Sequence, residues 1–324
     1  MTSAPTQTPM TTSMTTETPT PTPTTPDALR RLLVEHGYLL PTPTRGLPAF
    51  SGAFEDIVHG FAGLAGSALA PLEATAVRFP ALVAQPTLEA SGYVSSFPDL
   101  IGTVAVAPPQ DADRRQLCQT IKAGGDWTAH LRPAGLGFVS AACHSLYGAL
   151  RGQTVAPGTA YDVTGSCFRH EPSDDPIRMI TFRQREKVFF GTADEVAEQR
   201  TAMRESAHAL LTGLGLPISV DIATDPFTGQ GSRLLAASQR RYELKHEFTI
   251  PLYAGRDPVA VGSSNLHLNH YGAQFAITMP DGSTATSTCC GFGLERVAIA
   301  LIHTHGPDLA TWPGPVRAAL HLTA

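Results

Sequence analysis

Apolar residues recur at spacings of three and four along several stretches of the chain, the pattern of helices with one buried face. In residues 54–69 the repeating positions are Ile57, Phe61 and Leu64. We expect the first helix to be capped by Asp27, whose carboxylate can accept from a free N–H group. The helices predicted in this way cover residues 28–36, 54–69, 141–150, 192–214 and 233–245.

Short apolar or alternating runs, bounded by turn residues, predict strands between these helices. The polar stretch 171–176 joins two of them into a long antiparallel hairpin, and a last apolar helix is predicted from Gly291 to residue 302. Several strands follow one another without crossover helices, so we predict an α+β fold, an antiparallel sheet flanked by helices. The predicted strands are residues 76–80, 161–168, 186–190, 247–253, 259–268, 274–278 and 284–290.

The first 26 residues differ from the rest of the chain, because they are mostly Thr and Pro. Such a segment buries too little apolar surface to offset its ordering entropy. We therefore predict a disordered tail over residues 1–26 and one catalytic domain over residues 27–324. The length of 324 residues and the hydrophobic content of 42% suffice for one large core.

Charge and cysteine content narrow the function classes. A net charge of −5 and a pI near 6.2 disfavour a general nucleic-acid binder, since phosphate affinity depends on Lys and Arg. No apolar run predicts a membrane span or a secretory signal, so we expect a cytoplasmic protein. The five cysteines are scattered and odd in number, which disfavours a disulfide framework and leaves thiols free to bind metal.

Two segments far apart in the sequence together predict a site for ATP. Residues 166–186 contain an Arg-x-Glu and an Arg-x-x-x-Phe-x-x-x-Glu, and residues 291–296 read Gly-x-Gly-x-x-Arg. A carboxylate attacking the α-phosphorus of ATP needs fixed positive charge, which Arg169 and Arg296 can supply, while Phe182 can stack on adenine. Each motif alone is more often an exposed ion pair or a helix-packing element. Their order and combination favour adenylate chemistry.

A second set of residues has the chemistry of a metal site. Cys143, Glu186 and Cys289 lie far apart in sequence, but Glu186 and Cys289 fall on strands that can be neighbours. Two thiolates and a carboxylate suit Zn²⁺ and leave one position open for the α-amino group of a substrate. The alternative reading is that these cysteines are small buried hydrophobes.

These residues resemble the class II aminoacyl-tRNA synthetases. The hairpin looks like their motif 2, residues 291–296 like motif 3, and residues 54–80 like motif 1, the dimer-forming element. The chain is more similar still to the amino acid:[carrier protein] ligases, which resemble the catalytic core of the zinc-dependent seryl-tRNA synthetases of methanogens. The resemblance covers residues 45–305, and its matching segments are 141–144, 167–172, 182–186, 237–239, 244–245, 264–267, 270–272 and 289–296.

The resemblance implies a class II fold, a homodimer, and zinc together with ATP and Mg²⁺. It further implies transfer of a small amino acid, glycine or alanine, to the phosphopantetheine arm of an acyl carrier protein. By position the zinc ligands are Cys143, Glu186 and Cys289, and substrate contacts fall on Glu186, Asn265 and Asn269. The ATP-binding positions implied are Arg169, Glu171, Arg178, Met179, Phe182, Lys245, Ala260, Val261, Gly262, Ser263 and Arg296.

One segment departs from the family pattern. The family usually reads Asn-Tyr-His-Gln-Asp-His-Phe-Gly, whereas residues 265–272 read Asn-Leu-His-Leu-Asn-His-Tyr-Gly. Leu268 and Asn269 therefore replace a Gln and an Asp near the amino-acid pocket. The segment 227–231 also has less arginine than the family version. The sequence accordingly leaves open which amino acid is activated and whether these changes alter or abolish activity.

The acceptor of the activated amino acid is predicted from the residues before the catalytic region and from one basic helix. The residues before it have no basic or aromatic character suited to RNA, so we expect a carrier protein rather than tRNA. Helix 233–245 offers Arg233, Arg240 and Arg241 to an acidic partner, although a solvated basic face is the plain alternative. Two other functions stay open: a synthetase-like enzyme with another acceptor, and a non-catalytic amino-acid-sensing paralogue.

Overall fold

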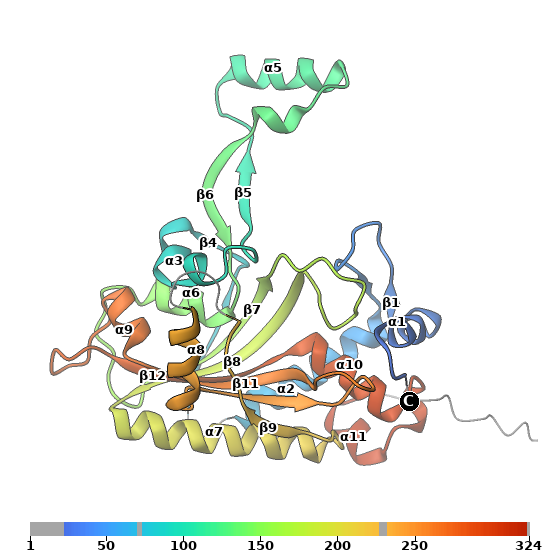
Figure 1. The fold of residues 1–324 in the computed structure, drawn as a ribbon, viewed down its shortest axis with the longest axis vertical. Helices are drawn as coiled ribbons and strands as arrows, with labels where there is room; N and C mark the ends of the chain where they lie inside the picture. Colours follow the sequence, from blue (N-terminus) through green and yellow to red (C-terminus); the bar gives the residue numbers. More distant parts are fainter. Residues whose placement is uncertain (1–22, 70–72, 227–231, 323–324) are drawn as a thin grey trace, which may run out of the picture.

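The computed structural model describes residues 23–69, 73–226 and 232–322. They form a body around a seven-stranded sheet, and a narrow arm projects from it (Figure 1). The strand order is β3-β7-β8-β12-β11-β10-β9, and every pair is antiparallel except the parallel pair β3–β7. The strands are β3 (Thr75–Phe79), β7 (Ala160–Phe168), β8 (Thr181–Gly191), β9 (Ser219–Ile222), β10 (Lys245–Ile250), β11 (Val259–Leu268) and β12 (Thr286–Gly293).

Helices cover both faces of this sheet. One face packs against α2 (Gly52–Ala68), α7 (Ala193–Gly213) and α10 (Leu294–His305) and holds the larger apolar core. The other face is covered at one end by α6 (Ala142–Ala149) and α9 (His270–Phe275), with a smaller core beneath them. At the N-terminal end, α1 (Pro26–Glu35) and the short pair β1 (Leu39–Leu40) and β2 (Ala49–Phe50) pack beside the larger core.

Strand β8 shows how the two faces receive different residues. Successive side chains of a strand point to opposite faces, so its odd-numbered residues meet the α2 side and its even-numbered residues the α6 side. On the α2 side, Arg183 pairs with both Glu55 and Glu295, and Arg185 pairs with Asp162. The face toward α6 receives Phe182, Gln184, Glu186, Val188 and Phe190.

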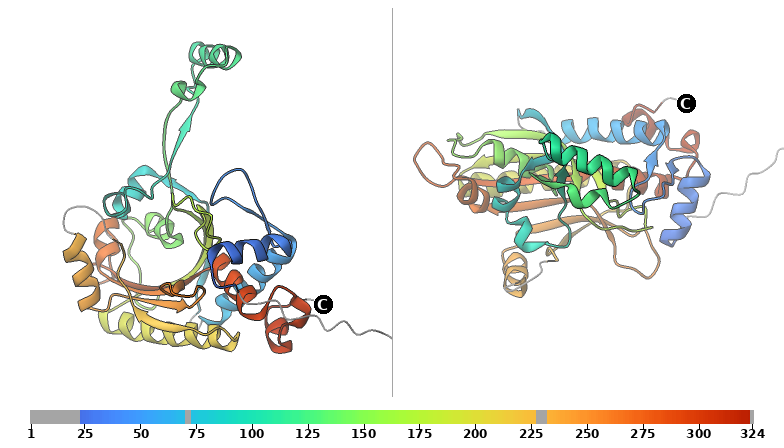
Figure 2. Two further views of the ribbon diagram at one scale, coloured as in Figure 1. Left: turned by 45° about the vertical axis from the view of Figure 1, so that its right-hand side comes forward. Right: turned by 90° about the horizontal axis from the view of Figure 1, so that it is seen from above.

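The projecting arm was not predicted from the sequence. It consists of β5 (Thr103–Val106) and β6 (Arg132–Phe138), tipped by α5 (Asp111–Lys122) and the 3₁₀ turn η1 (Trp127–His130) (Figure 2). At its base β6 also pairs with β4 (Leu82–Ala84), next to α3 (Gln85–Ala90) and α4 (Tyr93–Ser96). Leu117 and Ile121 of α5 are spaced as on one face of a helix, but no side chain of α5 is buried.

The remaining predicted elements are confirmed with four corrections and with shifted bounds, the largest shift being at β8, which begins at Thr181 instead of residue 186. The N-cap of α1 is Thr25, whose hydroxyl accepts from Ala28 N, and Asp27 lies in the first turn. The helix predicted over 233–245 is α8 (Ser232–Arg241), and Lys245 instead begins β10. The predicted strand 274–278 is wrong, because α9 occupies its start. The helix predicted from Gly291 begins only at Leu294.

Gly291 is part of β12 because of a close approach between strands. It lies opposite Glu186 of β8, and a Cβ added there would come within 2.5 Å of Glu186 Cγ and 2.8 Å of the Arg185 carbonyl oxygen. At Gly293 the nearest atom to an added Cβ is Arg296 Cδ, at 3.8 Å. The first glycine of the motif therefore leaves room for the Glu186 side chain, and the second has ordinary space around it.

We expect Gly291→Ala to destabilise the protein by about 1–3 kcal/mol, because the added methyl group overpacks the β8–β12 contact. Gly293→Ala is the matched control and should change the unfolding midpoint much less. Denaturant unfolding followed by circular dichroism measures both. Equal destabilisation by the two variants would contradict the assignment of the close approach to Gly291.

The predicted tail, residues 1–26, falls mostly outside the described residues. Its last part lies against the body, where Ala254 N donates to Thr24 O at 3.0 Å and His303 Nε2 lies 2.8 Å from Pro23 O. After α10 the chain continues through η2 (Leu309–Thr311) and α11 (Gly314–Ala319). In the described part of the chain, the helices are all too short or too polar to cross a bilayer.

Candidate active site

Cys143, Glu186 and Cys289 meet on the α6 face of the sheet. Cys143 comes from the first turn of α6, Glu186 from β8 and Cys289 from β12. One donor atom from each lies within 4.8 Å of the others, and the residues are only 4%, 5% and 3% exposed. Gln184 helps to place the first ligand, because its Oε1 accepts from Ala142 N at the uncapped start of α6, at 3.0 Å.

The electrostatics of this cluster favour a cation. Burial and the neighbouring Cys289 thiolate raise the pKa of Glu186 to about 8. A hydrogen bond shared between the two sulfurs raises the pKa of Cys143 and lowers that of Cys289. Glu186 Oε2 is buried without a hydrogen-bond partner among the described residues. Three buried acidic groups with one orphaned oxygen are costly unless a positive charge is shared between them, so the donor set fits a metal ion such as Zn²⁺.

Two further side chains lie beside the Cys289 sulfur: Asn265, which the sequence predicted as a substrate contact, and His267, which sequence reasoning missed. Asn265 Nδ2 and His267 Nε2 each lie 3.4 Å from this atom. The other ring nitrogen of His267 lies 2.9 Å from the hydroxyl of Tyr147 and 3.1 Å from that of Ser287. His267 was visible in sequence only as part of the Asn-x-His segment, where the matching residues gave it no role.

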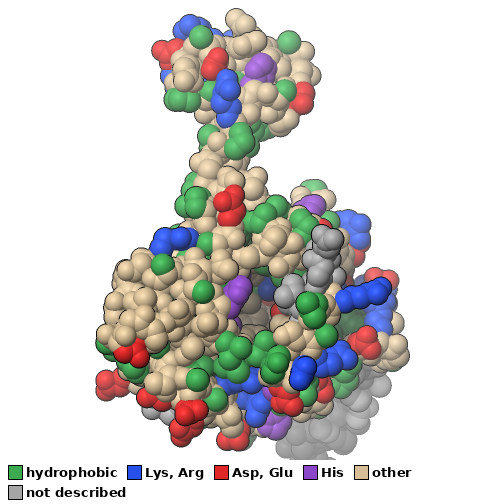
Figure 3. Space-filling view, turned by 60° about the vertical axis from the view of Figure 1, so that its left-hand side comes forward, with side chains coloured by type: hydrophobic (Ala, Val, Ile, Leu, Met, Phe, Trp, Pro, Cys, Tyr) green, Lys and Arg blue, Asp and Glu red, His purple; other side chains and the backbone are tan. Residues whose placement is uncertain are grey.

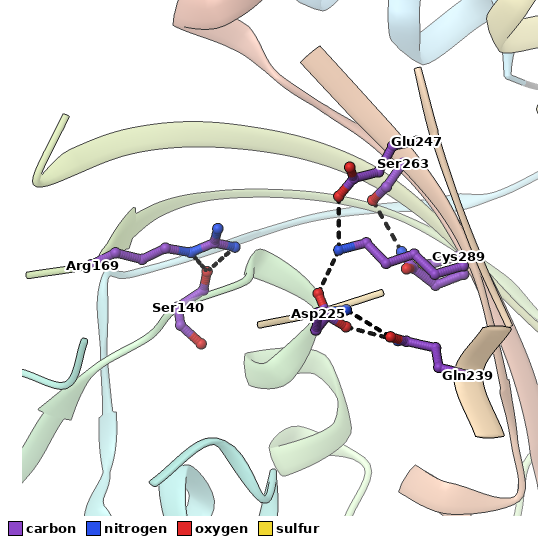
Figure 4. A network of polar contacts seen from close by, with 9 residues as sticks. Ser140, Arg169, Asp225, Gln239, Glu247, Ser263 and Cys289 are labelled. Carbon is purple, nitrogen blue, oxygen red and sulfur yellow. Dashed lines mark hydrogen bonds and ion pairs between the residues drawn. The ribbon is translucent and has the colours of Figure 1, made fainter. Parts of the chain in front are cut away.

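Arg169, one of the two arginines predicted to supply positive charge to ATP, directly follows the end of β7. Arg169 donates through Nε and Nη2 to the Ser140 carbonyl oxygen, at 3.3 and 3.2 Å, just before α6. Its guanidinium carbon lies 5.2 Å from the ring centroid of Phe182 on β8. Figure 4 shows Arg169 and Ser140 on one side of the site and Cys289 on the other. The hairpin therefore contributes residues to both halves of the site.

A second group of charges lies next to Arg169. Arg296 donates to the carbonyl oxygens of Ile177 at 2.9 Å and Ala260 at 3.0 Å, and Arg178 pairs with Glu171 at 3.2 Å. Burial and the positive charge of Arg169 lower the pKa of Arg296 to about 10, so it remains charged at neutral pH. The structure thus brings together the predicted ATP-binding residues of both motifs.

Lys245 lies in a buried ionic network rather than on a basic helix face. Its ammonium pairs with Asp225 and, at 2.9 Å, with Glu247. Burial opposes the charged form of Lys245, but these two carboxylates raise its pKa overall. Gln239 of α8 donates to Asp225 at 2.8 Å, so the network ties α8 to the base of the site (Figure 4).

The other predicted ATP and substrate residues differ in their burial and in how near they lie to the metal-ligand cluster. Ser263 Oγ accepts from Asn265 Nδ2 at 3.1 Å, near the metal-ligand cluster. Val261 is 1% exposed and its side chain belongs to the core on the opposite face, so only its backbone borders the site. Met179 is also buried. Asn269 is exposed and begins α9 beyond the end of β11, and its predicted substrate role stays a prediction.

The predicted carrier-binding arginines are exposed. Arg233, Arg240 and Arg241 all belong to α8, and the guanidinium of Arg241 lies 5.6 Å from the ring centroid of Tyr242. Figure 3 shows a hollow in the body below the arm, bordered by histidine and hydrophobic side chains. The segment 227–231, whose sequence differs from the family version, lies outside the described residues.

Comparisons with known proteins find relatives by sequence and by fold. No protein-family model matches the chain. The chain is 39% identical to amino acid–[acyl-carrier-protein] ligase 1 of Bradyrhizobium diazoefficiens over 279 residues, which cover 86% of this chain and 85% of that protein. A second ligase from the same organism is 38% identical, with 86% and 83% covered.

The chain belongs to the amino acid–[acyl-carrier-protein] ligase family.

Membership of this ligase family makes the chain an enzyme of the class II synthetase-like type. Type-2 serine–tRNA ligase of Methanopyrus kandleri is 28% identical over 264 residues, and the match covers 74% of this chain but only 49% of that protein. The fold agrees with that of M. kandleri SerRS solved with A. aeolicus tRNASec, with a TM-score of 0.77 at 19% identity, covering 90% of this chain and 60% of that one. Seryl-tRNA synthetase from Pyrococcus horikoshii, solved with ATP, gives 0.67 at 14% identity, covering 91% and 63%.

Proposed function

We propose that this ligase activates a small amino acid, glycine or alanine, with ATP and Mg²⁺ and transfers it to the phosphopantetheine thiol of an acyl carrier protein. The observation that carries this proposal is the meeting of two residue sets on one sheet face. Cys143, Glu186 and Cys289 form a buried donor set suited to zinc, and Arg169 stands with Phe182 beside them. The sequence relatives named as carrier-protein ligases support the acceptor.

The first step of this reaction joins the amino-acid carboxylate to ATP. A carboxylate oxygen attacks the α-phosphorus, and pyrophosphate leaves. Arg169 is positioned to hold the charge that develops on the α-phosphate, and Phe182 to stack on adenine. Arg296, fixed by the Ile177 and Ala260 carbonyl oxygens, supplies a second positive charge for the phosphates. Catalysis here consists mainly of positioning and charge stabilisation.

In the second step the carrier thiol attacks the carbonyl carbon of the aminoacyl-adenylate, and AMP leaves. Zinc held by Cys143, Glu186 and Cys289 would bind the amino group of the substrate and so orient it for both steps. The three ligands are at most 5% exposed, so the amino group would be bound in an enclosed position. Glycine or alanine is proposed as the substrate from the resemblance to the carrier-protein ligases.

Amino-acid-dependent ATP–pyrophosphate exchange with all twenty amino acids tests the proposal. We expect the zinc-loaded protein to exchange with glycine or alanine and to discriminate against large side chains. No exchange with any amino acid would contradict the enzyme function and favour the amino-acid-sensing alternative. Exchange followed by loading of tRNA instead of a carrier protein would favour the synthetase-like alternative.

Carrier docking on α8 gives a separate prediction. Reversing the charges of Arg240 and Arg241 to Glu should slow aminoacyl transfer at low carrier concentration by roughly tenfold or more, because it reverses the field that attracts an acidic carrier. The rate of pyrophosphate exchange should stay unchanged, because both side chains are exposed outside the described ATP contacts. Single-turnover transfer and exchange assays separate the two steps. Equal loss in both assays would show that α8 acts through the site itself.

We further propose a homodimer. Helix α2 and strand β3 occupy the positions of the dimer-forming motif that the sequence resembles, and β3 is an edge strand of the large sheet. An exposed edge strand is a ready surface for association with a second chain. Light scattering of the purified protein measures its oligomeric state directly, and a monomer at micromolar concentration would contradict this proposal.

A further inference from the structure

Cys289 is distinguished from the other members of the donor set by the hydrogen bonds to its sulfur. Asn265 Nδ2 and His267 Nε2 both lie 3.4 Å from Cys289 Sγ, within the distance of hydrogen bonds to sulfur. Asn265 lies directly opposite Cys289 in the β11–β12 pairing. The strand bulges between Leu266 and Leu268, at the position of His267. The local backbone therefore presents two side-chain nitrogens to one thiol.

His267 lies outside the metal-ligand cluster itself. The donor atoms of Cys143, Glu186 and Cys289 all lie within 4.8 Å of one another, and this group does not include His267. Its Nε2 is close to one sulfur rather than to all three donors. This position fits a hydrogen bond to a ligand better than a fourth bond to the metal.

The contacts on the opposite side of the imidazole are compatible with a proton on Nε2. His267 Nδ1 lies 2.9 Å from the Tyr147 hydroxyl, and Tyr147 is itself 2.9 Å from Ser287 Oγ. Burial raises the pKa of Tyr147 well above its ordinary value, so this hydroxyl keeps its proton. When Ser287 donates to Tyr147 and Tyr147 donates to Nδ1, the neutral imidazole carries its proton on Nε2 and donates it to Cys289.

We propose that His267 is a positioning residue for Cys289, through an Nε2–H···Sγ hydrogen bond whose direction is set by Tyr147 and Ser287. This inference rests on the proposed zinc centre. Tyr147 is 0% exposed and its ring lies edge-on to His267, with 5.8 Å between the ring centroids. The imidazole is therefore held by packing as well as by hydrogen bonds, in the orientation that places Nε2 beside the sulfur.

Hydrogen-bond partners of metal ligands commonly change metal affinity by 10–100-fold when removed. Loss of the imidazole leaves the Cys289 sulfur with only one of the two side-chain nitrogens that lie beside it, so the sulfur is less firmly oriented toward the metal. We therefore expect His267→Ala to bind zinc roughly 10–100-fold more weakly than the wild type. His267→Gln keeps an N–H donor at the end of the side chain and should recover much of the affinity.

Competition with a chromophoric zinc chelator measures this affinity on the full-length protein, with His36→Ala as the surface-histidine control. Cobalt substitution adds a readout that does not depend on activity. In His267→Ala the thiolate-to-cobalt charge-transfer band should shift, while the visible bands that report coordination number should keep their shape. A change in those visible bands would make His267 a metal ligand and overturn the proposal.

The outcomes separate this inference from the proposed function. Zinc binding by the wild type with unchanged affinity in His267→Ala, or a Gln variant no better than Ala, would overturn the inference alone. Absence of zinc from the wild type would contradict the proposed metal centre. If His267→Ala does not fold, a Tyr147→Phe/Ser287→Ala double variant removes both hydroxyl groups at Nδ1. Weaker zinc binding by this double variant supports the proposal, and unchanged binding contradicts it.

Discussion

Replacement of Arg169 by alanine should lower the rate of ATP–pyrophosphate exchange by roughly 10²–10³-fold, the usual effect of removing one preorganised donor to a transition-state charge. Arg169 fits this role because its guanidinium is held on two sides, by the Ser140 carbonyl oxygen and by the ring of Phe182. The charge is thus positioned before ATP binds. Little of the interaction energy is then spent on ordering a flexible side chain.

Two further variants sharpen this test. Arg169→Lys keeps the positive charge but loses the planar pair of donors, so its exchange rate should lie between those of the wild type and the alanine variant. Arg151→Ala is the control, because Arg151 stacks on Phe275 at 5.0 Å and has no described contact with Arg169. Steady-state kinetics should show a loss mainly in kcat. Wild-type kcat in Arg169→Ala would remove this residue from the catalytic machinery.

The hairpin β7–β8 was predictable because local signals determine it. Alternating residues, the polar 171–176 loop and the spacing of Arg169, Phe182 and Glu186 all act within a short segment. The sheet order and the pairing of β8 with β12 needed contacts across a hundred residues. The convergence of Cys143, Glu186 and Cys289 was expected from residue chemistry and resemblance, and in the folded protein their donor atoms lie together.

Other parts could not be predicted because tertiary contacts decide them. The segment after His270 is rich in residues typical of strands, but Tyr271 and Phe275 lie one helical turn apart and both stack on Tyr147, so it folds as α9. In the arm, α5 has apolar residues at helical spacing only at Leu117 and Ile121, and no side chain of this helix is buried. His267 acquires a partner in Cys289 only through the β11–β12 pairing.

The proposed metal centre predicts a large effect when one sulfur ligand, that of Cys289, is replaced. Cys289→Ser should remove most of the bound zinc and with it most amino-acid-dependent exchange, because a serine hydroxyl is a far poorer zinc ligand than a thiolate. Cys289 is also the donor whose pKa is lowered, by the hydrogen bond from Cys143, and it is therefore the thiol best prepared to bind a cation. Metal analysis of the purified variant measures the loss directly.

The neighbouring cysteine provides a matched control for this prediction. Cys290 is 0% exposed, belongs to the core on the opposite face, and its sulfur lies 3.8 Å from the Met203 carbonyl oxygen. Burial raises the pKa of Cys290 well above its ordinary value, so it remains a neutral thiol. Cys290→Ala should therefore keep zinc at the wild-type level and affect mainly the unfolding midpoint. Zinc content that falls in Cys290→Ala but not in Cys289→Ser would place the metal on the wrong side of the sheet for the substrate, and would overturn the site proposed here.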